Sequence, residues 1–249
     1  MRIIPPAARR AAYAILRRCG WEVRRWPHPA TAEGVLKRLL SQSDIDLVID
    51  VGANRGQYGR LLRSIGYTGR IVSYEPNPAA YGVLQATASR DDRWEVFCLA
   101  LGREQCERTL WVPKADDLAS LRPVTAFGRQ VFAEKIVARE AVNVTVSTLD
   151  NEYRRIKGES RRPLLKLDTQ GFDFEVLKGA DRSLNEFCII QIEISFLPLY
   201  EGVPRYRDVL AWLEDRGFGV SALTPGYCTV EGLLVEADAF LVRCAELEL

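Results

Sequence analysis

Hydrophobic residues follow two patterns along the chain, in short unbroken runs and in stretches with helical spacing. The first run covers residues 47–51 and leads into a glycine-containing turn. The hydrophobic positions of residues 57–65 then recur every three or four residues. This succession predicts a buried strand, a turn and a helix. Further runs predict strands over residues 70–75, 94–101, 164–168, 187–195, 218–223 and 239–244.

The alternation of strands and helices predicts an α/β fold of the Rossmann-like class, with one mostly parallel sheet of seven strands and helices on both faces. We expect the last strand, 239–244, to run antiparallel and to close the sheet as a hairpin with 218–223. Residues 108–148 interrupt the alternation, and 109–112 and 142–147 predict additional antiparallel strands. The long segment between these two strands is typical of a functional or disordered loop.

The turn after the first strand distinguishes between two kinds of ligand. It contains Gly52 and Gly56, but Asn54 occupies the position where a dinucleotide site requires a glycine. The side chain of Asn54 disfavours the close approach of a pyrophosphate. We expect both glycines to adopt unusual backbone dihedrals and to leave room for a ligand. Asn54 tolerates such a conformation and presents its amide to the site.

Carboxylates end the first two strands. Asp50 closes the first, and Glu75 closes the second, where Pro76 stops it. A carboxylate in the position of Glu75 can accept hydrogen bonds from both hydroxyls of a ribose. Asp50 would repel a phosphate and would attract an ammonium or sulfonium group. We therefore expect a phosphate-free, cationic nucleoside such as S-adenosylmethionine, with Asp50, Gly52, Asn54, Gly56, Glu75 and Pro76 around it.

Six motifs occur in a characteristic order between residues 46 and 197: DVGANRGQYGRLLR, YEPNP, CLALG, STLDNEY, LLKLDTQGFDFEVLKGA and IQIEIS. Together they resemble the FkbM family of S-adenosylmethionine-dependent methyltransferases, which are mostly O-methyltransferases of sugars and natural products. The resemblance implies that Ala100 and Leu101 line the adenine. It also implies that the segment around Ser120 lies over the site, with Ser120 as a candidate ligand contact.

Methyl transfer mainly requires the alignment of donor and acceptor, but an alcohol acceptor must also lose its proton. The single histidine, His28, lies outside the motifs, so carboxylates are the candidate bases. Asp168 and Glu193 end the fourth and fifth strands at the same edge of the sheet. In one interpretation one of them, Asp168 in particular, accepts the proton; in another both bind Mg²⁺. In a third, Asp168 orients the methionine end of the donor and Glu193 pairs with a basic residue.

The net charge of +1 over 249 residues gives no indication of nucleic-acid binding. The charge is unevenly distributed, however, because residues 1–28 carry a net charge of +6 and the remainder −5. We expect a basic helical extension over residues 1–40 and a methyltransferase domain over 41–249. The extension is interpreted as a peripheral contact with an anionic membrane, as a helix packed on the domain or as a mobile arm. The sequence does not predict the oligomeric state.

The six cysteines show no metal-ligand spacing, which favours reduced thiols in a cytoplasmic protein. No segment reaches the roughly 20 apolar residues that a membrane span requires. The resemblance to the FkbM family implies O-methylation of a hydroxyl, in a sugar of a glycan, glycolipid or secondary metabolite. One alternative, an NAD-dependent oxidoreductase or epimerase, is disfavoured by Asn54 and by the lack of a suitably placed Tyr-x-x-x-Lys pair. The other, a non-catalytic membrane-recruited module, does not account for the strand-end carboxylates.

Overall fold

Seven strands form the main sheet of the computed structural model, which describes residues 6–21 and 26–244. Their order in the sheet is β3-β2-β1-β7-β8-β10-β9, and β10 alone runs antiparallel to the other six strands. The predicted Rossmann-like sheet with an antiparallel last strand is therefore confirmed. The strands are β1 (Leu47–Val51), β2 (Arg70–Tyr74), β3 (Trp94–Phe97), β7 (Pro163–Leu167), β8 (Ile189–Ser195), β9 (Phe218–Pro225) and β10 (Glu236–Arg243).

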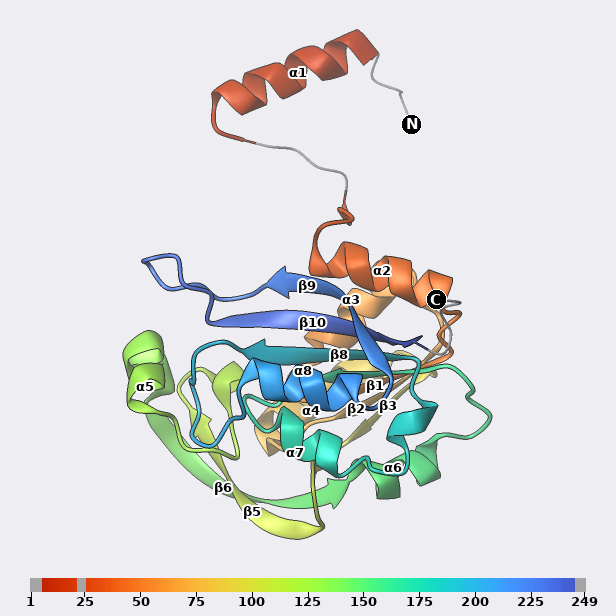
Figure 1. The fold of residues 1–249 in the computed structure, drawn as a ribbon, viewed down its shortest axis with the longest axis vertical. Coiled ribbons are helices and arrows are strands. Elements are labelled where there is room, and N and C mark those ends of the chain that lie inside the picture. Colours follow the sequence, from red (N-terminus) through yellow and green to blue (C-terminus); the bar gives the residue numbers. More distant parts are fainter. Residues whose placement is uncertain (1–5, 22–25, 245–249) are drawn as a thin grey trace.

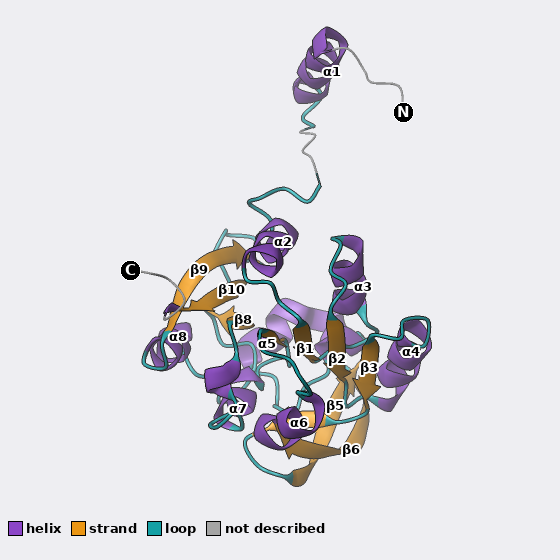
Figure 2. Cartoon of the chain, turned by 90° about the vertical axis from the view of Figure 1, so that its right-hand side faces the viewer, coloured by secondary structure: helices purple, strands orange, loops and turns teal. Residues whose placement is uncertain are grey.

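Helices cover both faces of this sheet (Figure 1 and Figure 2). One hydrophobic core lies between the sheet and α2 (Ala32–Gln42), α3 (Gln57–Ser64) and α4 (Pro78–Ala88). The other lies between the sheet and α6 (Leu149–Ile156), α7 (Asp173–Lys178) and α8 (Tyr206–Glu214). Because the central strands are buried on both sides, they are hydrophobic at almost every position.

A second, smaller sheet has the order β4-β6-β5, with β4 at Ala100–Gly102, β5 at Cys106–Pro113 and β6 at Ala138–Thr148. Strands β5 and β6 pair in antiparallel fashion, as predicted. The prediction of one strand over residues 94–101 is wrong: β3 ends at Phe97, and β4 pairs with β6 instead of with the main sheet. The segment between β5 and β6 contains η1 (Asp116–Leu118), α5 (Ala126–Phe132) and η2 (Ala133–Ile136).

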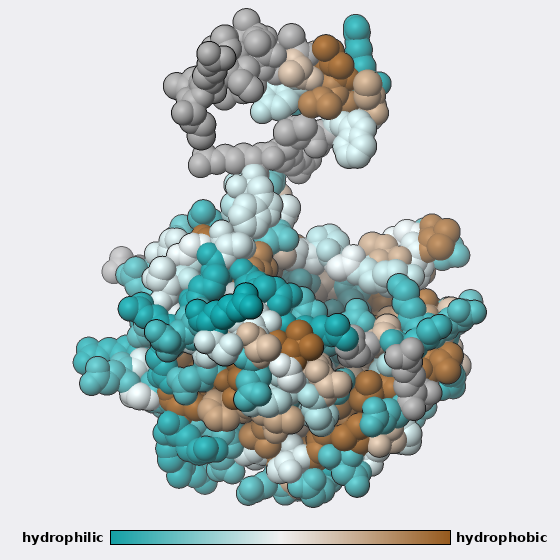
Figure 3. All heavy atoms as spheres, turned by 180° about the vertical axis from the view of Figure 1, so that it is seen from behind, coloured by the Kyte–Doolittle hydropathy of each residue, from teal (hydrophilic) through white to brown (hydrophobic). Residues whose placement is uncertain are grey.

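The first helix, α1 (Pro6–Arg18), lies apart from the sheets and their helices (Figure 1). Ile15 on this helix is exposed, and so is Trp21 after it. In Figure 3 hydrophobic and hydrophilic side chains occur together in this topmost part of the molecule. No helix among the described residues is long and apolar enough to cross a membrane. The peripheral membrane contact stays a prediction, and residues 1–5 and 22–25 of the extension lie outside the described residues.

The division predicted at residue 40 falls within α2. This helix begins at Ala32 after Thr31, whose side chain accepts a hydrogen bond from the backbone of Gly34. Its residues Val35, Leu36, Leu39 and Leu40 are buried against the main sheet. The helix therefore packs against the main sheet on the N-terminal side of residue 40, and the division of the chain into two parts stays a prediction.

Candidate active site

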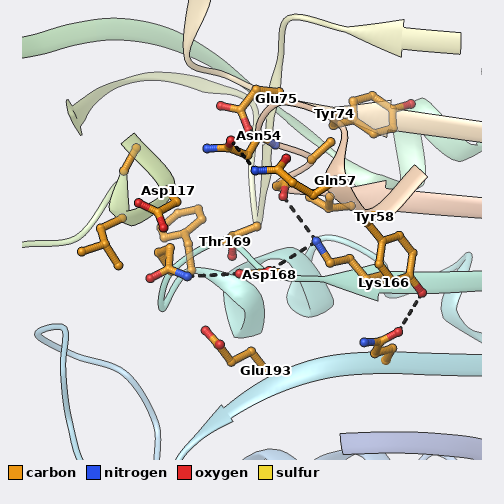
Figure 4. A pocket seen from close by; sticks show the side chains of 18 of the residues that line it. Asn54, Gln57, Tyr58, Tyr74, Glu75, Asp117, Lys166, Asp168, Thr169 and Glu193 are labelled. Carbon is orange, nitrogen blue, oxygen red and sulfur yellow. Dashed lines mark hydrogen bonds and ion pairs between the residues drawn. The ribbon is translucent and has the colours of Figure 1, made fainter. Parts of the chain in front are cut away.

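A cavity of about 610 Å³ lies at the edge of the main sheet where β1, β2 and β7 end (Figure 4). Its volume is within the range of small-molecule sites. The second sheet and the segment around η1 form another part of its wall. Of the residues predicted from the sequence, eight line this cavity: Gly52, Asn54, Glu75, Pro76, Ala100, Leu101, Asp168 and Glu193. The other three, Asp50, Gly56 and Ser120, are not part of its lining.

The turn after β1 has the left-handed backbone that the glycines predicted, since φ is +81° at Gly52, +46° at Asn54 and +83° at Gly56. At Gly52 the chain also passes very close to β7. A Cβ atom at this position would lie 1.8 Å from the carbonyl oxygen of Asp168. Gly56 precedes α3, where its backbone packs near Leu84. Gly52 thus allows the end of β1 to approach the end of β7, and Gly56 allows the turn to pack against α4.

Glu75 is held at the end of β2 by two backbone N–H groups. Its carboxylate accepts a hydrogen bond of 2.7 Å from Asn54 N and one of 2.8 Å from Asn77 N. The residue is only 5% exposed, and this burial raises the pKa of its carboxyl to about 7. The side-chain oxygen of Asn54 accepts a hydrogen bond of 2.7 Å from Arg55 N within the turn. The turn and the carboxylate therefore form one hydrogen-bonded unit at the cavity.

Asp50 lies behind the cavity wall and is 0% exposed. Lys166 Nζ is 3.0 Å from Asp50 Oδ1, and Ser73 Oγ donates a hydrogen bond of 3.3 Å to Asp50 Oδ2. Burial raises the pKa of Asp50, and the ammonium of Lys166 opposes this shift. The structure gives no support to a direct contact between Asp50 and the donor, because the carboxylate is directed into the protein and paired there.

Asp168 and Glu193 both face the cavity, as Figure 4 shows. The side chain of Asp168 is 42% exposed, and Lys166 Nζ lies 3.4 Å from its Oδ2. Glu193 is opposite Asp238 in the pairing of β8 with β10. Burial and the neighbouring carboxylates of Asp168 and Glu236 raise the pKa of Glu193 well above its usual value. The predicted partner of Glu193 is not found, since no Lys or Arg within the described part of the chain forms an ion pair with it.

The predicted Mg²⁺ ion is not supported. Among the described residues no group of three or more His, Cys, Asp or Glu side chains is arranged to hold a metal ion. A magnesium site needs several oxygen ligands in near-octahedral geometry. Asp168, one of the two carboxylates proposed as ligands, is already engaged by the ammonium of Lys166.

The segment that contains Ser120 lies over the site as expected, because its neighbours Ala119 and Leu121 line the cavity. Ser120 itself is 2% exposed. Its hydroxyl donates a hydrogen bond of 2.7 Å to the carbonyl oxygen of Gln170 and accepts one of 3.0 Å from Arg122 N. The ligand contact predicted for Ser120 is therefore not supported, since the hydroxyl connects two backbone segments instead.

A second set of polar residues at the cavity was not predicted. Tyr58 on α3 donates a hydrogen bond of 2.7 Å to Gln191 Oε1, and Gln191 Nε2 donates one of 3.3 Å to Asp238 Oδ1. These three residues line the cavity together with Lys166 and Glu236. The available signal was a polar residue inside an otherwise hydrophobic strand, as at Gln191 in IIQIEIS and at Lys166 in PLLKL.

The chain has recognisable relatives. The sequence model of the methyltransferase FkbM domain matches residues 50–220. Methyltransferase sdnD of Sordaria araneosa is 26% identical over 195 residues, which cover 70% of this chain and 74% of that protein.

Two solved structures illustrate the structural neighbours. Cofactor-bound Rv0187 from MTB has a TM-score of 0.49 at 14% identity, with 94% of this chain and 88% of that chain covered. The methyltransferase domain of a bacterial CtHen1 has a TM-score of 0.47 at 14% identity, with 84% and 96% covered. Because the FkbM sequence model spans more than half of the chain and ends beyond the cavity residues of β7 and β8, the protein belongs to the FkbM methyltransferase family.

Proposed function

We propose that this methyltransferase transfers the methyl group of S-adenosylmethionine to a hydroxyl oxygen, in a small molecule or in a sugar of a glycan or glycolipid. The observation that carries the proposal is the position of Glu75. Its carboxylate is fixed by the backbone of Asn54 and Asn77 and borders a cavity of about 610 Å³. Each carboxylate oxygen has a further lone pair, so Glu75 can still accept hydrogen bonds from the two hydroxyls of a ribose.

The chemistry of the cavity lining suits the donor. Ala100 and Leu101 are buried apolar residues of the wall, against which a flat adenine can pack. Among the described lining residues, Lys166 is the one basic side chain, whereas Glu33, Glu75, Asp117, Asp168, Glu193, Glu236 and Asp238 are acidic. Such a lining favours a cationic ligand and disfavours a pyrophosphate. This balance supports S-adenosylmethionine over NAD.

Glu193 is the better-placed base for the acceptor hydroxyl. Asp168 is engaged by Lys166 and by Gln170, whose Nε2 donates a hydrogen bond of 3.1 Å to Asp168 Oδ1. Glu193 borders the same cavity, and burial raises the pKa of its carboxyl. Bound S-adenosylmethionine would supply an electrophilic methyl group, and Glu193 would accept the proton that the hydroxyl loses.

Two measurements test the proposal. In thermal unfolding, S-adenosylhomocysteine and S-adenosylmethionine should raise the Tm, because a ligand that binds only the folded state stabilises it by about 2.7 kcal/mol at 100 times its Kd. NAD at the same concentration should have no effect. With S-adenosylmethionine labelled in its methyl group, a cell extract should yield a labelled product that resists mild alkali, as an ether does and a carboxyl methyl ester does not. A rise in Tm with NAD alone would contradict the proposed donor.

A further inference from the structure

A row of polar residues crosses the middle of the hydrophobic sheet next to the cavity. Ser73, Asp50, Lys166 and Gln191 are in register on β2, β1, β7 and β8, and all four are buried. Burial of charged groups costs free energy, and hydrophobic residues in place of a buried ion pair are often neutral or stabilising. The ion pair between Asp50 and Lys166 is therefore better explained by a role in the site than by stability.

Lys166 contacts the ends of β1 and β7 at the cavity. Its Nζ lies 3.0 Å from Asp50 Oδ1 and 3.3 Å from the carbonyl oxygen of Gly52. It also lies 3.4 Å from Asp168 Oδ2 (Figure 4). The contact with the Gly52 carbonyl is a hydrogen bond, and the contacts with the two carboxylates are ion pairs. Burial by itself lowers the pKa of Lys166, but Asp50 and Asp168 outweigh that effect and raise the pKa above its usual value. Lys166 is therefore charged, and its ammonium group lies between the two carboxylates.

Asp168 differs from Asp50 because a ligand can reach it. Its side chain is 42% exposed and lines the cavity, whereas Asp50 is fully buried. Lys166 holds Oδ2 of Asp168 and Gln170 holds Oδ1. Since two carboxylate oxygens offer about four lone-pair positions, these two contacts fix the orientation of Asp168 and leave acceptors for a bound cation.

We infer that Lys166 is a positioning residue for the donor, acting through Asp168, and that Asp50 is the buried counter-charge of Lys166. This inference rests on the proposed function, since it assigns to Asp168 the ammonium group of S-adenosylmethionine or of its product. Lys166 touches neither ligand. Its ammonium group holds the carboxylate of Asp168 toward the cavity and also donates a hydrogen bond to the Gly52 carbonyl.

A comparison of stability with binding separates this role from a purely structural one. K166M leaves Asp50 buried without its counter-charge, so we expect a lower Tm. The double variant D50N/K166M removes both charges, and its Tm should recover. Calorimetry should nevertheless find that its affinity for S-adenosylhomocysteine stays at least about tenfold below wild type. If D50N/K166M recovers the wild-type Tm and also binds S-adenosylhomocysteine with wild-type affinity, the inference is overturned.

A second pair of substitutions keeps the test decisive if the double variant does not fold. If Lys166 acts through Asp168, K166Q should weaken binding of S-adenosylhomocysteine by about tenfold in the wild-type background and by less than about twofold in a D168A background. Equal losses in both backgrounds would overturn the inference.

Two controls complete the design. Lys178 is partly buried and pairs with Glu175 at 3.3 Å, but it does not line the cavity. K178Q should therefore bind S-adenosylhomocysteine as the wild type does. Wild-type protein that binds no S-adenosylhomocysteine at all would show that the proposed donor is wrong, and the inference would fall with it. Binding by wild type together with unchanged binding by D50N/K166M would contradict the inference alone.

Discussion

Glu75 Oε2 lies 2.7 Å from the backbone nitrogen of Asn54, so the residue that ends β2 is directly hydrogen-bonded to the turn that follows β1. The second carboxylate oxygen accepts the N–H of Asn77. A single side chain thereby connects the turns that follow β1 and β2 at the cavity. The carboxylate that could bind a ligand is also the group that holds the side chain in place, through its hydrogen bonds to Asn54 and Asn77. Glu75 is therefore the first target for substitution.

E75Q should lower the affinity for S-adenosylhomocysteine by about 10- to 100-fold, because an amide has only one acceptor oxygen and its NH₂ would face a backbone N–H. Isothermal titration calorimetry measures the loss. E95Q is the matched control, since Glu95 on β3 is exposed and pairs with Arg70 at 2.7 Å. Wild-type affinity in E75Q would remove Glu75 from the donor site.

The affinity should also depend on pH. The pKa of Glu75 is about 7 in the folded protein, against an ordinary value of 4.5. Ribose hydroxyls donate to the ionised carboxylate, so binding of S-adenosylhomocysteine should strengthen by up to about tenfold between pH 6 and pH 8. The contribution of Glu75 to folding stability has the opposite sign. A raised pKa favours the protonated folded state, so this stability is present below pH 4.5 and is lost as the pH rises toward 7.

Calorimetry at pH 6, 7 and 8 measures this dependence. The E75Q variant has no carboxyl at this position, so whatever affinity it retains should change less with pH than that of the wild type. An affinity that falls in wild type as the pH rises would contradict the assignment of the ribose to Glu75.

The regular part of the fold was predictable because the central strands are buried on both faces. β1 and β7 therefore appear in the sequence as continuous hydrophobic runs. The break between β3 and β4 was not predictable, since the hydrophobic run continues through it. Ala100 leaves the main sheet to pair with Val146, which is distant in the sequence. A local pattern contains no information about such a partner.

In the candidate site, too, local patterns were predictable from the sequence and contacts between distant segments were not. Gly52 and Glu75 were found because a strand followed by a turn is a local pattern, and both line the cavity. The burial of Asp50 was missed because its counter-charge, Lys166, comes from a strand much later in the chain. Ser120 was placed in the correct segment, but the direction of its hydroxyl depends on the backbone of Gln170. Contacts between distant segments thus set the limit of prediction.

Gly52→Ala should lower the free energy of unfolding by more than about 3 kcal/mol. A Cβ would lie 1.8 Å from the carbonyl oxygen of Asp168, so the ends of β1 and β7 would have to separate. Gly66→Ala is the control, because Gly66 also has a positive φ, of +96°, but no atom lies within 4 Å of its Cβ position. It should cost only about 1–2 kcal/mol. Equal losses in urea unfolding would contradict the close contact.

Ser120→Ala tests the structural role that replaces the predicted ligand contact. The buried hydroxyl bonds two backbone segments, so its loss should lower the free energy of unfolding by about 1–3 kcal/mol. Binding of S-adenosylhomocysteine should change by less than about twofold, which is less than one lost hydrogen bond would cause. S89A, in which an exposed hydroxyl is removed, should change the stability by less than about 0.5 kcal/mol. Strongly weakened binding in S120A would restore Ser120 as a ligand contact.

The position of the donor product in a crystal structure with S-adenosylhomocysteine tests the central claim most directly. We expect the ribose hydroxyls about 3 Å from the carboxylate of Glu75, the adenine against Ala100 and Leu101, and the ammonium group toward Asp168. S-adenosylhomocysteine bound away from the Gly52 turn, or with no contact to Glu75, would contradict the account.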